Sequence, residues 1–309
     1  MASPLVSIVM CTYNGALVLD EQIRSILDQD YDKFELVIVD DVSTDDSFQK
    51  LEQWAAQSPK IRLYQNEKNL GYNRNFEKAI GLAKGDFIAI SDQDDIWMPE
   101  KISLQLAAFT SGGVLITHGM SVILENGKLQ FKKRKLHYHY SGNDPRKLFF
   151  FNPVQGHDMM FRKELVASVL PIPEGIMYDW WIAVNAAAMG RIVSVPEVLV
   201  YQRIHQTNSF FGDTKSKRKT QPDLDQLLRV ITKVRDLDSD DRQFLQTLLQ
   251  FVERQSQPGA GFNFKFFTFL FSNRNIFFGH KRRLFPLFSY FKNSIKYAKV
   301  NFRGKGLSY

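Results

Sequence analysis

The stretch Phe87-Ile88-Ala89-Ile90-Ser91-Asp92-Gln93-Asp94-Asp95 (residues 87–95) joins a short apolar run to a cluster of acidic residues. The apolar run is typical of a strand buried on both faces. Carboxylates that directly follow such a strand offer hard oxygen ligands to a divalent cation such as Mn²⁺ or Mg²⁺. A solvated acidic turn that caps the next helix is the alternative, and the spacing alone leaves both open.

Two stretches upstream repeat this pattern of an apolar run followed by polar residues. Residues 6–10 precede Thr12, Tyr13 and Asn14, and residues 34–39 precede Asp40 and Asp41. A further strand is expected at 61–64, with helices at 19–27, 43–56, 75–83 and 99–109 between the strands. Strands that alternate with crossover helices predict a doubly wound, mostly parallel α/β sheet, whose ligands bind at the carboxyl ends of the strands.

The second half of the chain is mixed. Strands are expected at 113–118, 121–124 and 191–195 and a helix at 179–188, while residues 158–161 lead into a short helix. Residues 212–220 form a polar linker, and two helices are expected at 223–236 and 239–256. We therefore predict an α/β domain over 1–211, a linker and helical extension over 212–258, and a separate C-terminal segment over 259–309.

Composition is that of a globular protein: 309 residues, 44% hydrophobic and 24% charged, with one cysteine, Cys11. A single cysteine excludes an internal disulfide and fits a reducing compartment. Neither a signal peptide nor a membrane-spanning run of about 18 apolar residues is expected.

The basic charge belongs to the C-terminal segment. Residues 259–309 contain ten Lys or Arg and no Asp or Glu, against a net charge of +7 for the whole chain. Phenylalanines alternate with these cations, a pattern typical of helices that lie in an anionic membrane interface. Packing against the catalytic domain is the plain alternative. We expect no nucleic-acid partner, because no recognisable nucleic-acid module accompanies the charge.

The order of these motifs resembles the family-2 glycosyltransferases of the GT-A fold, over about residues 4–208. The blocks that carry the resemblance are 6–14, 36–45, Asn69-Leu70-Gly71, Gly85-Asp86-Phe87-Ile88 and 92–97. The resemblance implies a GT-A, Rossmann-like fold with a mixed acceptor half, followed here by C-terminal helices. It also implies transfer of a sugar from a nucleoside diphosphate, with a divalent metal.

The resemblance assigns roles by position. On the nucleotide-sugar side it places Cys11, Tyr13, Asn14, Asp41, Arg74, Asp92 and Arg203. Tyr13 and Asp41 are expected to contact the nucleotide base, with Asp41 pairing with the imide N–H of a pyrimidine. Asp92 is expected to reach the ribose, and Asp94 to ligate the metal. Arg203 and His205 lie in a Tyr-x-Arg-x-His pattern; Arg203 is a candidate phosphate clamp and His205 a candidate metal ligand.

Asp179, in Tyr178-Asp179-Trp180-Trp181, matches the acidic position that supplies the catalytic base in the family. An inverting transfer needs a carboxylate that removes the acceptor hydroxyl's proton. Trp180 and Trp181 are candidates for an apolar surface that binds the acceptor sugar. His157 and Asp158 are candidate acceptor contacts. An N-cap aspartate followed by core tryptophans is the structural alternative.

The resulting hypothesis is an inverting, metal-dependent hexosyltransferase, with a dTDP- or UDP-linked donor and a glycan or lipid-linked acceptor in bacterial surface polysaccharide synthesis. The Asp-Trp-Trp block and Asn75-Phe76-Glu77 resemble rhamnosyltransferase-like members. The expected location is the cytoplasm, at the inner face of the cell membrane. A nucleotidyltransferase and a non-catalytic carbohydrate-binding protein on the same fold are the alternatives.

Overall fold

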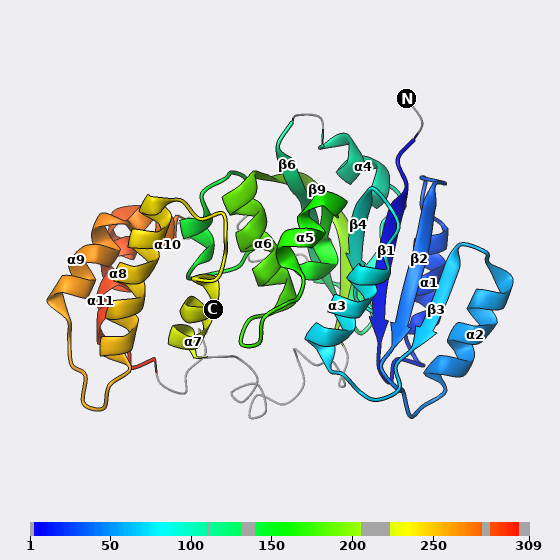
Figure 1. The fold of residues 1–309 in the computed structure, drawn as a ribbon, viewed down its shortest axis with the longest axis horizontal. Coiled ribbons are helices and arrows are strands. Elements are labelled where there is room, and N and C mark those ends of the chain that lie inside the picture. Colours follow the sequence, from blue (N-terminus) through cyan, green and yellow to red (C-terminus); the bar gives the residue numbers. More distant parts are fainter. Residues whose placement is uncertain (1–2, 110–111, 131–139, 205–222, 280–284, 303–309) are drawn as a thin grey trace. The chain divides into compact units, whose positions relative to one another are not determined.

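The computed structural model describes residues 3–109, 112–130, 140–204, 223–279 and 285–302 (Figure 1). Within these ranges it divides into two compact units. The first holds residues 3–143, 154–172 and 177–204; the second holds 144–153, 173–176 and 223–302. The expected boundary at 211 lies outside the described residues. The helical extension and the C-terminal segment share one unit, to which 144–153 and 173–176 also belong.

The first unit is built on a nine-stranded sheet in the order β3-β2-β1-β4-β8-β6-β9-β5, with β7 paired to β6. The strands are β1 (Val6–Thr12), β2 (Phe34–Asp40), β3 (Ile61–Gln65), β4 (Phe87–Ser91), β5 (Ile96–Trp97), β6 (Val114–Glu125), β7 (Lys128–Leu129), β8 (Met159–Arg162) and β9 (Arg191–Ile204). β1 pairs in parallel with β2 and β4, and β2 with β3. The predicted parallel half is therefore confirmed.

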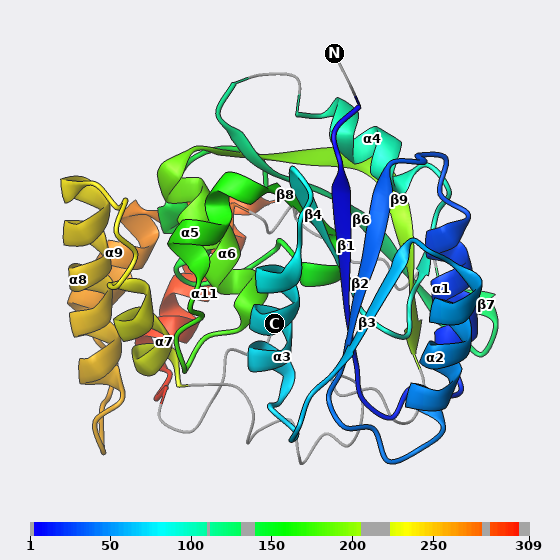
Figure 2. The same cartoon turned by 45° about the vertical axis from the view of Figure 1, so that its right-hand side comes forward.

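Six α-helices belong to this unit: α1 (Leu19–Leu27), α2 (Ser47–Gln57), α3 (Tyr72–Leu82), α4 (Lys101–Ala107), α5 (Val166–Val169) and α6 (Tyr178–Met189). Two short 3₁₀ helices, η3 (Gly156–Asp158) and η4 (Lys163–Leu165), flank β8. Figure 2 shows α3 on one side of β1–β3 and α1 and α2 on the other. Ile8 and Leu36 pack in a core with Ile23 of α1 and Leu51 of α2. Continuous apolar strands are needed because helices cover both faces.

The mixed half differs from the sequence expectation at two places. Residues expected to lead into a helix form β8, which runs antiparallel to β4 with Ala89 opposite Met160. The two strands expected at 113–118 and 121–124 form one strand, β6, with register shifts around Met120 in its pairing with β9. A short apolar run cannot by itself distinguish a buried strand from a helix turn, so sheet pairing decided both.

The second unit is helical. It contains η2 (Pro145–Leu148), α7 (Leu224–Ile231), α8 (Ser239–Gln255), α9 (Phe264–Ser272), α10 (Arg274–Phe278) and α11 (Pro286–Lys299). Aromatic rings form its interior: Phe251 stacks on Phe266 at 5.1 Å, and Phe278 stacks on Tyr297 at 5.9 Å. None of the described helices combines the length and the apolar character needed to cross a membrane.

Candidate active site

The carboxyl ends of β1, β2 and β4 meet at one edge of the sheet in the first unit. The strand registers place Thr12 opposite Asp40 and Met10 opposite Ser91. The residues that follow each strand therefore face one another, as expected for parallel strands. This edge brings together the three polar clusters that the sequence singled out.

The carboxylate of Asp41 is buried and accepts several hydrogen bonds from residues of the same chain. It is 3% exposed, and it accepts hydrogen bonds from the Asn66 amide at 2.7 Å and from the backbone N–H groups of Leu70 and Gly71, each at 2.8 Å. Gly71 has a φ of 75°, in the left-handed region that suits glycine. Asp41 thus fixes the loop before α3; its predicted contact with a base stays a prediction.

The loop after β1 is tied to both of its neighbours. Gln93 accepts from the Tyr13 N–H at 2.9 Å and donates to the Tyr13 carbonyl at 3.1 Å. The Asn14 side chain accepts from the Thr44 N–H at 2.8 Å, in the loop after β2. The backbone of Tyr13 is therefore fixed while its side chain remains 47% exposed. Asn14, a predicted nucleotide contact, acts here as a link between two loops.

A turn over Gln93 and Asp94 brings Asp92 and Asp95 to the same side of the chain. Together with His157 they form a cluster whose potential ligand atoms lie within 4.8 Å of one another. Asp94, the predicted metal ligand, is not part of this cluster. The first and fourth residues of a tight turn approach closely, whereas the prediction used the one-residue spacing of Asp92 and Asp94.

His157 reaches the cluster because β8 runs antiparallel to β4. The start of β8 therefore lies beside the end of β4, and η3 places His157 Nδ1 3.5 Å from an Asp92 carboxylate oxygen. His157 and Asp158 are 4% and 5% exposed. Their role as acceptor contacts stays a prediction, although burial this deep favours contact with a small ion over contact with a glycan or lipid-linked acceptor.

The chemistry of this cluster fits a divalent cation. Asp95 Oδ2, His157 Nε2 and Asp158 Oδ1 are buried without a hydrogen-bond partner, which is costly in a protein interior. Burial lowers the pKa of His157, but Asp158, Asp95 and Asp92 outweigh it and raise that pKa to about 10. A cation has to displace this proton, because only a neutral imidazole is a ligand.

Asp179 lies at the start of α6 and belongs to the same site. Burial raises its pKa to about 6, and the nearby Asp92 carboxylate adds to the shift, while hydrogen bonds from the Trp180 and Gly156 N–H groups oppose it. Gly156 is required there, since a Cβ would lie 1.9 Å from the Tyr178 hydroxyl. A carboxylate with a raised pKa is suited to general-base catalysis near neutral pH.

Cys11 lies between the two acidic strand ends. Burial, together with Asp92 and Asp41, raises the pKa of its thiol well above the usual value, so the thiol stays protonated at neutral pH. The charges of Asp41 and Asp92 thus act on Cys11, and that of Asp92 acts on Asp179.

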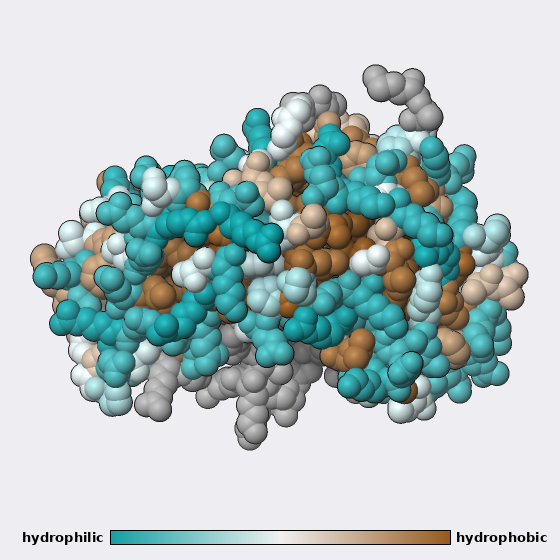
Figure 3. All heavy atoms as spheres, in the orientation of Figure 1, coloured by the Kyte–Doolittle hydropathy of each residue, from teal (hydrophilic) through white to brown (hydrophobic). Residues whose placement is uncertain are grey.

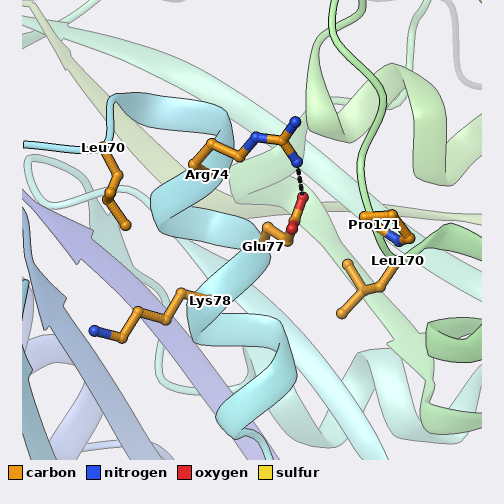
Figure 4. A pocket seen from close by; sticks show the side chains of 6 residues that line it. All are labelled: Leu70, Arg74, Glu77, Lys78, Leu170 and Pro171. Carbon is orange, nitrogen blue, oxygen red and sulfur yellow. Dashed lines mark hydrogen bonds and ion pairs between the residues drawn. The ribbon is translucent and has the colours of Figure 1, made fainter.

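Arg74 lines a shallow pocket of about 550 Å³ with Leu70, Glu77, Lys78, Leu170 and Pro171 (Figure 4). Its guanidinium lies 2.6 Å from the Glu77 carboxylate and donates to the Ile172 carbonyl at 3.0 Å. The ion pair and the hydrogen bond of Arg74 join α3 to the segment after α5. Over α3 and α5, hydrophobic side chains reach the surface between hydrophilic ones (Figure 3).

Two other predicted positions are only partly placed. Arg203, in β9, is paired with Glu21 at 2.7 Å. His205, the predicted second metal ligand, lies outside the described residues. Arg203 as a phosphate clamp and His205 as a ligand both stay predictions.

The tryptophans divide between core and surface. Trp181 is 5% exposed, and its indole N–H donates to the Val169 carbonyl at 2.9 Å. These contacts favour the alternative of a core tryptophan, and the predicted contact of Trp181 with the acceptor sugar stays a prediction. Trp180, beside Asp179, is half-buried and keeps its predicted role as a hypothesis.

A mixed α/β sheet, whose parallel half ends in acidic residues at one edge, defines an enzyme of the GT-A type. A model of glycosyl transferase family 2 matches residues 7–170, and the chain belongs to this family. A Haemophilus influenzae glycosyltransferase of uncharacterised activity is 27% identical over 69% of this chain and 70% of its own length. An Escherichia coli β-1,3-glucosyltransferase that uses UDP-Glc and α-D-GlcNAc-diphosphoundecaprenol is 32% identical over 40% of this chain and 49% of its own.

Solved structures share the fold at low sequence identity. Staphylococcus aureus TarS in complex with UDP-GlcNAc superimposes with a TM-score of 0.60 at 18% identity, covering 88% of this chain and 81% of TarS. A mannosyltransferase from Pyrobaculum calidifontis in complex with GDP-Man and Mn²⁺ gives 0.59 at 16% identity, covering 96% and 86%. An Escherichia coli protein named as a putative colanic acid biosynthesis glycosyl transferase is 40% identical over 34% of this chain and 38% of its own length. The chain is thus a glycosyltransferase with relatives in polysaccharide biosynthesis, which sets aside the nucleotidyltransferase alternative.

Proposed function

We propose that this glycosyltransferase transfers a hexose, with inversion, from a pyrimidine nucleoside diphosphate to a hydroxyl of a glycan or lipid-linked acceptor in bacterial surface polysaccharide synthesis. The observation that carries the proposal is Asp179, a carboxylate with a pKa of about 6 beside Asp92 at the sheet edge. dTDP and UDP are the two donor nucleotides proposed, and rhamnose is the leading sugar.

In the proposed reaction Asp179 accepts the proton of the acceptor hydroxyl. The acceptor oxygen forms a bond to the anomeric carbon as the bond to the diphosphate oxygen breaks, and the nucleoside diphosphate leaves. Attack opposite the leaving group inverts the anomeric configuration. At pH 7 a carboxyl with a pKa of about 6 is mostly ionised, so Asp179 is ready to take this proton.

Asp92, Asp95 and His157 are the residues proposed to hold a divalent cation. When bound, Mn²⁺ or Mg²⁺ would supply charge to balance the leaving diphosphate. The three side chains would orient it, and Asp158, 3.5 Å from His157 Nε2, would hold the imidazole in place.

Asp179→Asn tests this function. The variant keeps the side-chain shape but cannot accept the proton, so turnover should fall by about 10²–10⁴-fold while nucleotide-sugar affinity is retained. dTDP-rhamnose and UDP-hexoses with Mn²⁺ should be screened for release of the nucleoside diphosphate, with the product's anomer assigned by NMR. A retained anomeric configuration, or unchanged turnover in the variant, would refute the mechanism.

We also propose that the second unit contacts the membrane. Its phenylalanine face consists of Phe262, Phe264, Phe285, Phe288 and Phe291, which are 48%, 69%, 75%, 70% and 46% exposed. Exposed lysines flank it on α9 and α11: Lys265, Lys292, Lys296 and Lys299. Partly exposed aromatic rings among lysines, in a stretch without acidic residues, match an anionic lipid surface. A lipid-linked acceptor would then be met at the cytoplasmic face of the membrane.

Co-sedimentation with vesicles tests the membrane contact. The protein should bind vesicles containing phosphatidylglycerol and not pure phosphatidylcholine, and binding should weaken as salt is raised. Replacing Phe264 and Phe288 by Ser should weaken it at least fivefold without changing hydrolysis of a soluble nucleotide sugar. Equal binding to neutral and anionic vesicles would contradict the proposal.

A further inference from the structure

Tyr72 is an exposed aromatic residue within the site. It is the first residue of α3, and its side chain is 45% exposed although its ring lies 5.2 Å from both Phe76 and Tyr178. One side of the ring therefore packs against buried aromatics while the other meets solvent. A rigidly packed aromatic with one open face is typical of a ligand-binding surface.

The backbone on both sides of Tyr72 is fixed. Asp41 accepts from the Gly71 N–H at 2.8 Å, and the Asn73 side chain accepts from the Tyr178 N–H at 3.1 Å. These bonds tie the start of α3 to the end of β2 and to the start of α6. The open ring face is thus preorganised, which lowers the entropy cost of binding a ligand.

The surroundings of the Tyr72 hydroxyl indicate which ligand it faces. Burial raises the pKa of this hydroxyl well above its usual value, Asp92 and Asp179 add to the shift, and a hydrogen bond with Tyr178 opposes it. Asp92 and Cys11 belong to the nucleotide side of the proposed site, and Asp179 is the proposed base. Tyr72 follows Gly71, whose N–H is bonded to Asp41, and its ring lies against that of Tyr178, the residue before Asp179. It therefore lies between the nucleotide side and the proposed base, where the transferred sugar would sit.

We propose that Tyr72 binds the transferred sugar of the donor, with its ring against the sugar's apolar face and its hydroxyl donating to a sugar oxygen. This inference rests on the proposed function, because it assumes that the donor is a nucleoside diphosphate sugar. It adds a residue that would select the donor sugar rather than the nucleotide.

The test compares two ligands that differ only in the sugar. Calorimetric affinities for UDP and UDP-glucose, and for dTDP and dTDP-rhamnose, are measured with Mn²⁺. Tyr72→Ala should weaken the binding of the nucleotide sugar at least tenfold and change the affinity for the nucleoside diphosphate alone less than twofold. Tyr72→Phe, which keeps the ring, should weaken the nucleotide sugar only about two- to fivefold.

Tyr13→Ala is the matched control, because Tyr13 is 47% exposed and is expected at the base. It should weaken both ligands equally. Three outcomes overturn the inference: Tyr72→Ala weakens both ligands alike, weakens neither, or raises only the KM for the acceptor. If the unmodified protein bound the bare diphosphates but no nucleotide sugar, the donor class itself would be refuted, and the inference with it.

Discussion

Two strand ends in this protein look alike in sequence and differ in structure. Asp40-Asp41 at the end of β2 and Asp92–Asp95 after β4 are both acidic clusters next to a buried apolar run. Asp41 accepts three hydrogen bonds from its own chain, whereas Asp95 is 1% exposed and has a carboxylate oxygen without a partner. The comparison teaches that a buried carboxylate serves the structure when N–H groups of its own chain occupy its oxygens. It is open to a ligand when an oxygen has no such donor.

The largest expected effect comes from the second cluster. Asp95→Asn removes a buried carboxylate that is proposed to hold the cation, so turnover should fall by about 10²–10⁴-fold. Thermal unfolding should be unchanged or shifted upward, because burial raises the pKa of Asp95 well above its usual value and thus disfavours the charged form, which Asn does not have. Activity assays at increasing Mn²⁺, beside melting curves, give both readings. If the variant were active and had a lowered melting temperature, Asp95 would serve the structure rather than a ligand, contrary to the comparison with Asp41.

The first cluster should respond in the opposite way. Asp41→Asn places an amide N–H₂ against N–H donors that now bind a carboxylate, so the free energy of unfolding should fall by about 1–3 kcal/mol. Urea denaturation measures this. Thr44→Ala, in the adjacent loop, is a milder control. Unchanged stability, together with a large loss of nucleotide affinity, would show that Asp41 serves the ligand rather than the loop.

The pH profile gives a smaller effect. Asp179 must be ionised to act as a base, so kcat/KM should fall about tenfold per pH unit below its pKa of about 6. Its folded pKa is raised, so its contribution to stability is full below the unfolded value of about 4 and lost as pH rises through 6. Activity and this part of stability thus move in opposite directions. Asp179→Asn should be at least as stable as the unmodified protein at pH 7.

Cys11 offers the smallest expected effect. Its thiol lies near both clusters and stays protonated, so Cys11→Ser replaces one neutral group by another of similar size. The KM for the nucleotide sugar should change less than about threefold, the size of one weak neutral hydrogen bond. Initial-rate kinetics check this. A tenfold or larger change would mean that the sulfur itself contacts the nucleotide, in contrast to both carboxylate clusters.

The sequence by itself determined the parallel half of the sheet and the family. Continuous apolar runs at 6–10, 34–39 and 87–90 specify strands buried on both faces, and local periodicity specifies the helices between them. Because parallel strands place their carboxyl ends at one edge, the sequence also located the site there. The roles of Asp92 and Asp179 came from the resemblance to the family, and they stay predictions.

Only the tertiary structure decided which side chains meet within that site. The antiparallel pairing of β8 with β4 carried His157 to Asp92, and a turn carried Asp95 there in place of Asp94. Packing likewise moved Trp181 into the core and left Tyr72 open. These outcomes depend on contacts between residues far apart in the chain, whereas a sequence pattern reports only on residues close together in the chain. Which buried polar groups find a hydrogen-bond partner is likewise decided only in the folded protein.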